Sequence, residues 1–426
     1  MTRKLFRATA ATAVCLLAVA CTEARKAAPE RIVYTDSLTG NEVWQITSDD
    51  SMSNMSYFEA QSFTADDKYA VFKSRRGDGR WKLFRSSMAD GTVSPLSDRT
   101  AAGSYTVHPN GREVCFLDSG IVWAVDVETL AERPLLDTRS AITGDDVRFS
   151  SSFTADGNYP LLSSNTEGIG TEIYRAYLPE GRIEKIYTVP TRCSHPLLNP
   201  VDPNIVTFVP YPDRQNDFSL SLQERARTWI IRLTEEGDGS LKADARPFLM
   251  MPEGFRATHE TWSADGERFY FFRKQVRRDL KYFKPVSVCS VDKNGEDLKV
   301  YYSNDTVKLG HGLASRDQKW FIADSQDPRT NPLFLINLET GDHLLAQFEP
   351  DHPVAVFPRT SFDQRLGPLR GLHLRPEHRN AAGIRDSHRE TDRARMTEKR
   401  CPAPAVRAPL FILIDNIVIL PKKRMP

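Results

Sequence analysis

Apolar and polar residues alternate over short stretches through most of this chain, and one stretch shows the pattern most clearly. In RFYFFRK, residues 268–274, Phe269 and Phe271 fall on one face, and Tyr270 and Phe272 fall on the other. A period of two residues predicts a β-strand with both faces buried. The Ala-Asp-Gly sequence just before it is a tight-turn signal. The segment before the turn, THETW, therefore predicts a partner strand, with His259 at its far end where a side chain could face a ligand.

The same phrase recurs along the chain: an apolar residue, a turn of the Asp-Gly or Pro-Asn-Gly type, and an alternating strand. The intervals between successive copies are 44, 46, 45, 64, 51 and 49 residues. The apolar anchors are Phe63, Val107, Phe153, Leu198, Trp262, Leu313 and Phe362. An outer hairpin, such as EIYRAYLPEGRIEKIY or PLFLINLETGDHLL, follows most copies. Repeats of this length with about four short strands each predict an all-β, seven-bladed β-propeller.

Two segments extend this picture. The strand that begins at Ile32 is expected to close the ring by pairing with the last blade. The long fourth interval contains an insertion, residues 211–222, on a loop face where functional residues commonly lie. Propellers also serve as binding scaffolds without catalysis, so the fold alone does not decide the function.

Composition excludes some classes of function. The 426 residues carry a formal net charge of +1, which gives no field that would favour nucleic acid as a partner. Aromatic residues make up 10% of the chain, as suits a β-rich protein. No apolar run long enough for a spanning helix occurs after the N-terminus. The sequence does not indicate an oligomeric state.

The N-terminus predicts export. Arg3, Lys4 and Arg7 form a basic region, residues 8–20 form a short apolar region, and Ala-Val-Ala-Cys then ends at Cys21. This order predicts a bacterial lipoprotein signal over residues 1–21, lipidation of Cys21, and a location in the periplasm or on the outer membrane. The alternative is an ordinary secretory signal cleaved nearby. Residues 22–30 are then a linker and residues 31–364 the propeller.

Residues 365–426 break the pattern. They contain 14 Lys and Arg against 6 Asp and Glu, one Phe, no Tyr and no Trp, and the last blade phrase stops at Gln364. Codon degeneracy allows LHLRPEHRNAAGIRDS to be read in the next frame as FTSDLNTGTPQVYVT, which would supply the missing strands. The hypothesis is that this tail is an out-of-frame translation and that the last blade is incomplete. A natural basic, disordered tail is the alternative.

Three phrases carry the chemistry: THETWSADG around His259, GHGLASRDQKWFIADSQDP around His311, and NPLFLINLETG. Together they resemble the oligogalacturonate lyases, a seven-bladed family that degrades short pectin fragments. The resemblance covers residues 31–364 and is more specific in the last five blades than in the first two.

The resemblance implies a role for each matching residue. His259 matches the base that removes the C5 proton of a uronate, and Arg227 matches the residue that holds the sugar and stabilises the developing charge. His311 matches a ligand of a divalent cation of the manganese type. The implied reaction is β-elimination across C4–C5 of an oligogalacturonide. A cation and an arginine on the carboxylate make the enolate-like intermediate accessible, and a neutral histidine takes the proton.

The chain departs from the family at the rest of the metal site. Where the family completes the site, this chain has Val354, Phe357, Pro358 and Arg359, none of which suits a hard divalent ion. His352 lies nearby but out of register, so it is a weak candidate ligand. With the metal site incomplete, we expect the lyase activity to be impaired in this chain.

Each candidate also has an alternative interpretation. His259 could be a satisfied polar residue at a strand end, Arg227 could pair with Glu224 or an outer-strand acid, and Gly-His-Gly at His311 could be a plain turn. His195 is a structural residue or a substrate contact. The missing ligands favour a second function, a non-catalytic exported propeller that binds a carbohydrate or a protein. The THETW and GHG phrases favour the lyase.

Overall fold

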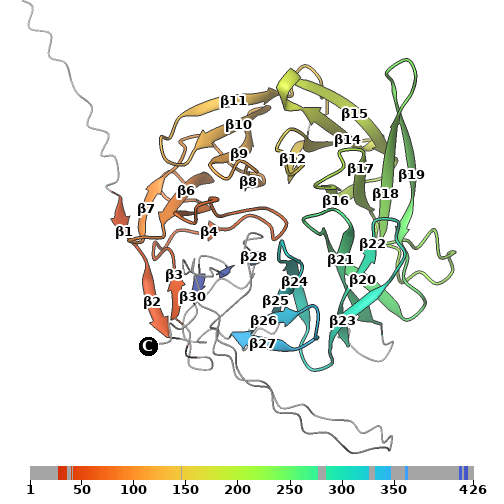
Figure 1. The fold of residues 1–426 in the computed structure, drawn as a ribbon. Helices are drawn as coiled ribbons and strands as arrows, with labels where there is room; N and C mark the ends of the chain where they lie inside the picture. The colour runs from red at the N-terminus through yellow and green to blue at the C-terminus, as the bar shows by residue number, and fades with distance from the viewer. Residues whose placement is uncertain are drawn as a thin grey trace, which may run out of the picture.

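The architecture is an all-β ring of antiparallel sheets (Figure 1). The computed structural model describes residues 27–35, 40, 42–144, 146–276, 285–325, 332–346, 360–362, 412–414 and 417–420. The predicted signal segment, Cys21, and residues 352–359 lie outside the described residues. Only one helical turn, the 3₁₀ turn Leu178–Glu180, occurs in the described part. Within that part, no helix is long and apolar enough to cross a membrane.

Six blades are each built mainly from consecutive strands, with the first strand nearest the centre of the ring (Figure 1). The first blade has β4 (Ser53–Asn54), β5 (Tyr69–Ser74), β6 (Lys82–Ser87) and β7 (Thr92–Pro95), with β1 (Ala28–Pro29) added outside. The second has β8 (Tyr105–Val107), β9 (Glu113–Asp118), β10 (Ile121–Asp126) and β11 (Glu132–Asp137). The third has β12 (Asp146–Phe153), β13 (Pro160–Thr166), β14 (Gly170–Tyr177) and β15 (Arg182–Val189).

The next three blades follow the same order. The fourth has β16 (Cys193–Leu198), β17 (Ile205–Pro210), β18 (Thr228–Glu235) and β19 (Leu241–Leu249). The fifth has β20 (Phe255–Trp262), β21 (Arg268–Gln275), β22 (Val286–Asp292) and β23 (Lys299–Asn304). The sixth has β24 (Leu309–Ala314), β25 (Trp320–Ser325), β26 (Leu333–Asn337) and β27 (His343–Ala346). The predicted all-β propeller is confirmed.

A seventh sheet joins the two ends of the chain. Its order is β28-β29-β30-β3-β2, formed by β28 (Thr360–Phe362), β29 (Ile412–Ile414), β30 (Ile417–Leu420), β3 (Glu42–Gln45) and β2 (Ile32–Thr35). The early strand thus joins the sheet that contains the last blade phrase, as predicted, with β3 making the direct pairing to β30. Two strands of this sheet, β29 and β30, come from the basic tail.

The repeated phrase forms the same turn in several blades. In the third blade, the Thr154 hydroxyl donates to Asp156 at 2.5 Å and accepts the Tyr159 N–H at 3.1 Å. In the fifth, Ser263 donates to Asp265 at 2.6 Å and accepts the Arg268 N–H at 2.8 Å. Side-chain hydroxyls and carboxylates that bond to nearby backbone favour turns over continued strand. The sequence repeat therefore closes the first hairpin of each of these blades by the same local bonds.

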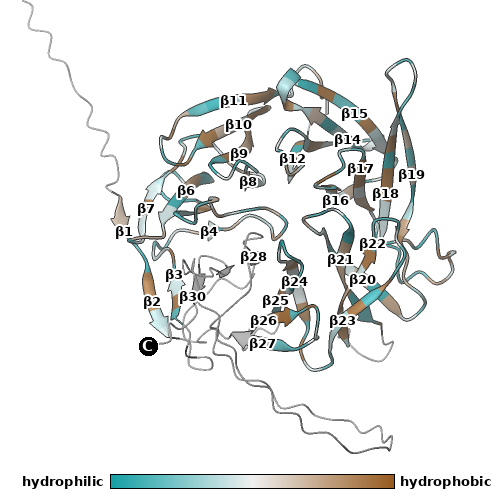
Figure 2. Cartoon of the chain, viewed as in Figure 1, coloured by the Kyte–Doolittle hydropathy of each residue, from teal (hydrophilic) through white to brown (hydrophobic). Residues whose placement is uncertain are grey.

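The core lies between blades rather than inside a single sheet. Phe269 and Phe271 of β21 pack with the fourth blade, whereas Tyr270 and Phe272 pack with the sixth. The two buried faces explain the continuous aromatic run that the sequence shows at this strand. Figure 2 shows that hydrophobic residues gather on the strands, whereas many of the connecting loops are hydrophilic.

Candidate active site

Three inner strands carry histidines at or beside a bulge. His195 on β16 and His259 on β20 each lie three residues before a buried anchor of the repeat, and both have a positive φ, 50° and 57°. The strand pairing shifts register around each of them. Positive φ is uncommon for residues other than glycine, and bulges often re-aim a side chain next to a functional site. The repeat thus places two imidazoles at equivalent points of adjacent blades.

His259 lies among rings rather than among hydrogen-bond partners. Its ring centroid is 4.5 Å from that of His311 and 6.2 Å from those of Phe58 and Phe272. Its Nδ1 atom is buried and has no hydrogen-bond partner among the described residues. Burial, followed by the positive charge of Lys274, holds the pKa of His259 well below its usual value of 6.5. A neutral imidazole with a free nitrogen is the form that can accept a proton.

His311 on β24 is held in place by a buried carboxylate. Asp324 on β25 accepts the His311 backbone N–H at 2.7 Å and lies 3.0 Å from His311 Nδ1. The Asp324 side chain is fully buried. Burial raises the pKa of Asp324, although its bonds to His311 oppose that shift. The pair fixes the orientation of the His311 ring and leaves Nε2 as the nitrogen that could contact a ligand.

His195 is paired with an acid. Its Nδ1 lies 3.3 Å from Glu59 Oε1. Burial disfavours the charged imidazole, but the hydrogen bond and charge of Glu59 outweigh burial, and the pKa of His195 is raised. The pairing supports the structural interpretation of His195, because a nitrogen committed to Glu59 is less available to a substrate.

The segment between β4 and β5 brings Tyr57, Phe58 and Glu59 to the histidines. Figure 1 shows this segment reaching across the ring from β4 toward β24. Tyr57 lies 5.5 Å from the His195 ring and 5.3 Å from the His311 ring, and Phe58 lies 5.3 Å from the His311 ring. Phe58 is fully buried. The segment therefore contacts all three histidines.

Arg227 lies directly before β18 and is fully engaged by two acids. Its Nε donates to Glu260 Oε1 at 2.8 Å, and its Nη1 donates to Asp213 Oδ2 at 3.2 Å. Arg256 donates to the same Asp213 oxygen at 3.0 Å. The predicted alternative, an ion pair between Arg227 and Glu224, is wrong. Glu224 instead accepts hydrogen bonds from Ser221. Glu260, the residue after His259, is the acid that sequence reasoning missed.

The inserted segment 211–222 packs against β20, the strand that carries His259. Besides Asp213, it supplies Gln215, whose amide accepts the Ala257 N–H at 2.7 Å and donates to the Ala257 carbonyl at 3.1 Å. The Gln215 side chain thus bonds to Ala257 as a neighbouring strand would, through both the N–H and the carbonyl, two residues before His259. The insertion thus contacts both β20 and Arg227, and its functional role stays a prediction.

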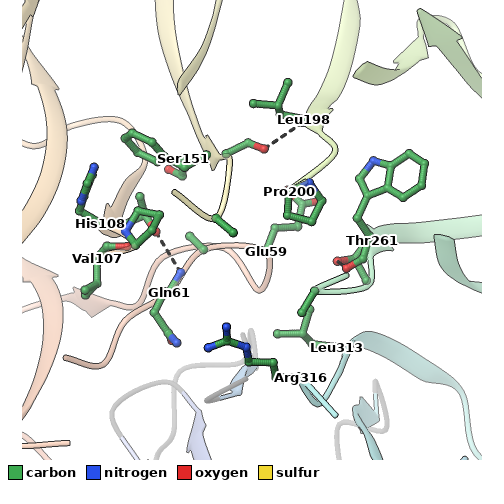
Figure 3. Close-up of a pocket in the computed structure, with 18 of the residues that line it drawn as sticks. Glu59, Gln61, Val107, His108, Ser151, Leu198, Pro200, Thr261, Leu313 and Arg316 are labelled. Carbon is green, nitrogen blue, oxygen red and sulfur yellow. Dashed lines mark hydrogen bonds between the residues drawn. The ribbon is translucent and has the colours of Figure 1, made fainter. Parts of the chain in front are cut away.

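A cavity of about 310 Å³ opens beside the histidine cluster. Its lining includes Glu59, Gln61, Ser151, Thr261 and Arg316, with Glu59 and Gln61 on the segment between β4 and β5 (Figure 3). His259 and His311 do not line it. Glu59, which also contacts His195, is the connection between the cavity and the histidines. We place the candidate chemistry at the histidines because the bulges, the free nitrogen and the charges gather there.

The described residues do not assemble a metal centre. Among them, no group of three or more His, Cys, Asp and Glu side chains could hold a metal ion. His311 and Asp324 bond to each other, and the ring beside them belongs to His259. The weak candidate His352 and the family positions 354 and 357–359 lie outside the described residues.

Solved proteins share this fold, although no sequence comparison identifies a relative. Neither the protein-family models nor the curated protein sequences compared with the chain match it. A solved oligogalacturonate lyase in complex with manganese is similar over 80% of this chain and 92% of its own, with 19% identity and a TM-score of 0.62. This chain has the fold of the oligogalacturonate lyases.

A second oligogalacturonate lyase structure, from Vibrio parahaemolyticus, agrees. It is similar over 79% of this chain and 91% of its own length, with 17% identity and a TM-score of 0.61. The match covers nearly all of each oligogalacturonate lyase, so the shared feature is the whole ring rather than a few blades.

Proposed function

We propose that this protein is a pectin-fragment lyase that cleaves oligogalacturonides by β-elimination. The observation that carries the proposal is the cluster of His259, His311 and Arg227 inside a fold shared with the oligogalacturonate lyases. The sequence phrases that resemble that family contain His259 and His311, and their ring centroids, on β20 and β24, lie 4.5 Å apart.

In the proposed reaction His259 is the base. The substrate is a uronate whose C5 hydrogen lies next to a carboxylate. His259 takes the C5 proton, the C5 electron pair forms the C4–C5 double bond, and the C4–O bond breaks with its electron pair leaving on the glycosidic oxygen. That oxygen takes a proton from water and departs as the neighbouring sugar, and the protonated His259 returns its proton to the solvent. The low pKa of His259 keeps the imidazole neutral and ready at neutral pH.

Arg227 contributes positive charge beside the base. Its N–H groups already donate to Glu260 and Asp213, so it does not offer the substrate a free pair of hydrogen-bond donors. Its guanidinium is held between Glu260 and Asp213, which fixes its position next to His259. A preorganised charge of this kind stabilises the enolate-like carboxylate without reorganising during the reaction. Glu260 is fully buried, so it depends on Arg227 for compensation.

The role of manganese is a separate part of the proposal. In the family a divalent cation would polarise the substrate carboxylate. The donor set of the described residues, an imidazole committed to Asp324 and a neighbouring imidazole, does not by itself fit a hard divalent ion. We therefore assign no step of the reaction to a metal.

Product analysis tests the proposal. Digalacturonate would be incubated with the purified protein, with and without added manganese, and the products identified by mass spectrometry. Elimination gives one galacturonate and one unsaturated uronate with no water added. Hydrolysis products, or unchanged substrate in both conditions, would contradict the proposal. Galactobiose, which lacks the carboxylates, is the matched control substrate and should stay intact.

A binding protein is the second candidate function. The pairing of Arg227 with two acids and the lack of a metal group among the described residues favour it. A protein that binds digalacturonate tightly but leaves it uncleaved would establish this alternative.

The proposal includes export as a lipoprotein anchored through Cys21. The basic and apolar N-terminal pattern supports it. In a bacterial host, Cys21→Ala should move the protein from the membrane fraction to the soluble fraction. An unchanged distribution of the variant would contradict the anchor.

A further inference from the structure

Lys274 is a buried lysine that none of the roles above uses. It lies on β21 with 4% of its surface exposed. Alternation along the strand places it on the face of Phe272, whose ring lies 6.2 Å from that of His259. In the strand pairing it stands opposite Arg256, three residues before His259. The side chain therefore enters the same end of the ring as the proposed base.

The charges around Lys274 come from every strand packed against this face. On β20 they are Arg256, Glu260 and His259; on and before β24 they are His311 and Lys308; on β25 the acid is Asp324. Among the described residues, none forms an ion pair or a hydrogen bond with the Lys274 ammonium. Glu260 is committed to Arg227, and Asp324 is committed to His311. A buried cation without its own counterion is costly, and an anionic ligand would supply the missing counterion.

We propose that the Lys274 ammonium receives the carboxylate of the uronate whose C5 proton His259 removes. The inference rests on the proposed function and names the cation that recognises the acidic substrate. The ammonium has three donors and no acceptor, which suits a carboxylate oxygen. The position next to His259 lets one uronate place its carboxylate on Lys274 and its adjacent C5–H at the base. Positive charge there also stabilises the enolate-like carboxylate as the proton leaves.

The ionisation of Lys274 supports this role. Burial, followed by the charges of Lys308 and Arg256, lowers the pKa of Lys274 from 10.5 to about 7. A bound carboxylate would favour the charged form, so binding should draw a proton onto the site. The free protein near neutral pH thus avoids part of the cost of a buried charge, which the anionic substrate compensates when it arrives.

Calorimetric binding of digalacturonate at pH 6 tests the inference without requiring turnover. Lys274→Gln should weaken binding by about 10- to 100-fold, the range for a lost hydrogen bond to a charged group. Lys274→Met is the second variant in case the amide finds new partners. Lys242→Gln, at an exposed position on β19, is the matched control and should bind as the wild type does. Thermal melts would verify that each variant is folded.

The pH dependence separates a binding role from a structural one. Wild-type affinity should fall by about tenfold per pH unit above 7, because the lysine must be protonated to bind. Lys274→Arg stays charged and should bind with a much flatter profile. Equal affinity of the wild type and Lys274→Gln would overturn the inference while leaving the proposed function standing. No binding of digalacturonate by the wild type would overturn both.

Discussion

At the residue scale, the site depends on buried ionisable groups, and Asp324 is the one most tightly coupled to a functional candidate. It accepts two hydrogen bonds from His311, through the backbone N–H and the ring. Asp324→Ala would leave both groups unpaired in a buried place. We expect a loss of about 2–4 kcal/mol in the free energy of unfolding, measured by denaturant titration.

Asp342→Ala is the matched control for this prediction, because Asp342 is exposed on the β26–β27 hairpin. It should change the free energy of unfolding by less than about 0.5 kcal/mol. If Asp324→Ala were as mild as the control, the Asp324–His311 pair would not organise the site.

The ionisation of Lys274 makes stability depend on pH. Its pKa is about 7 in the folded protein and about 10.5 when unfolded, so between these values the unfolded chain binds more protons. The stability of the wild type should therefore rise as pH increases from 7 to 10.5. Lys274→Met lacks this group, so it should be more stable than the wild type at pH 6, by about 1.4 kcal/mol per unit of pKa shift.

Thermal melts of both proteins over this range would check the prediction. The difference between the two melting temperatures should shrink steadily as the pH rises. A constant difference would mean that Lys274 keeps its ordinary pKa in the folded protein.

At the element scale, the approach of β24 to β25 positions His311. Gly312 lies where a Cβ would be 2.4 Å from the Phe321 ring and 2.7 Å from the Ile322 carbonyl oxygen. Gly312→Ala should therefore push the two strands apart and cost about 1–3 kcal/mol of stability. Gly103→Ala, where no heavy atom lies within 4 Å of the new Cβ, is the control for a chemical denaturation series. A neutral Gly312→Ala would show that the strands separate easily.

Sequence periodicity predicts the elements better than it predicts the site. The repeated phrase and the alternation around Phe269–Phe272 lead directly to the strands and turns, because both are set by local bonds and by burial on two faces. The sequence predicts His259 at a strand end, whereas the residue lies inside β20 at a bulge. A bulge depends on how two strands pair, which a period of two residues does not reveal.

The contacts of the site come from distant parts of the chain, which explains what the sequence did not predict. Glu59 reaches His195 across 136 residues, and Asp213 joins Arg227 to Arg256 from the insertion. Of these features, only the insertion could be recognised in the sequence, because it lengthens the interval between two repeats. In the sequence, Lys274 is one of many residues in alternating strands, and nothing in the pattern marks it as buried. Its burial follows from the packing of β21 against neighbouring strands.

At the scale of the whole molecule, the seventh sheet closes the ring with strands from both ends of the chain. We propose that residues after Gln364 are an out-of-frame translation, so that β29 and β30 stand in for the hairpin that the other frame would encode. A chain with the frame restored should melt at a higher temperature than the chain as given, because strands with the repeat's own sequence would replace β29 and β30 beside β28. Equal melting temperatures, or an intact reading frame on resequencing, would contradict this proposal.

The central claim is that the histidine cluster performs elimination, with His259 as the base. The measurement that tests it most directly is the ultraviolet absorbance of a conjugated unsaturated uronate formed from digalacturonate, comparing the wild type with His259→Ala. His343→Ala, on the outer strand β27, is the matched control. We predict product with the wild type and the control, and a loss of about 10²- to 10⁴-fold in rate for His259→Ala with an unchanged thermal melt. Equal rates for the wild type and a folded His259→Ala variant, or no product from the wild type, would contradict the account.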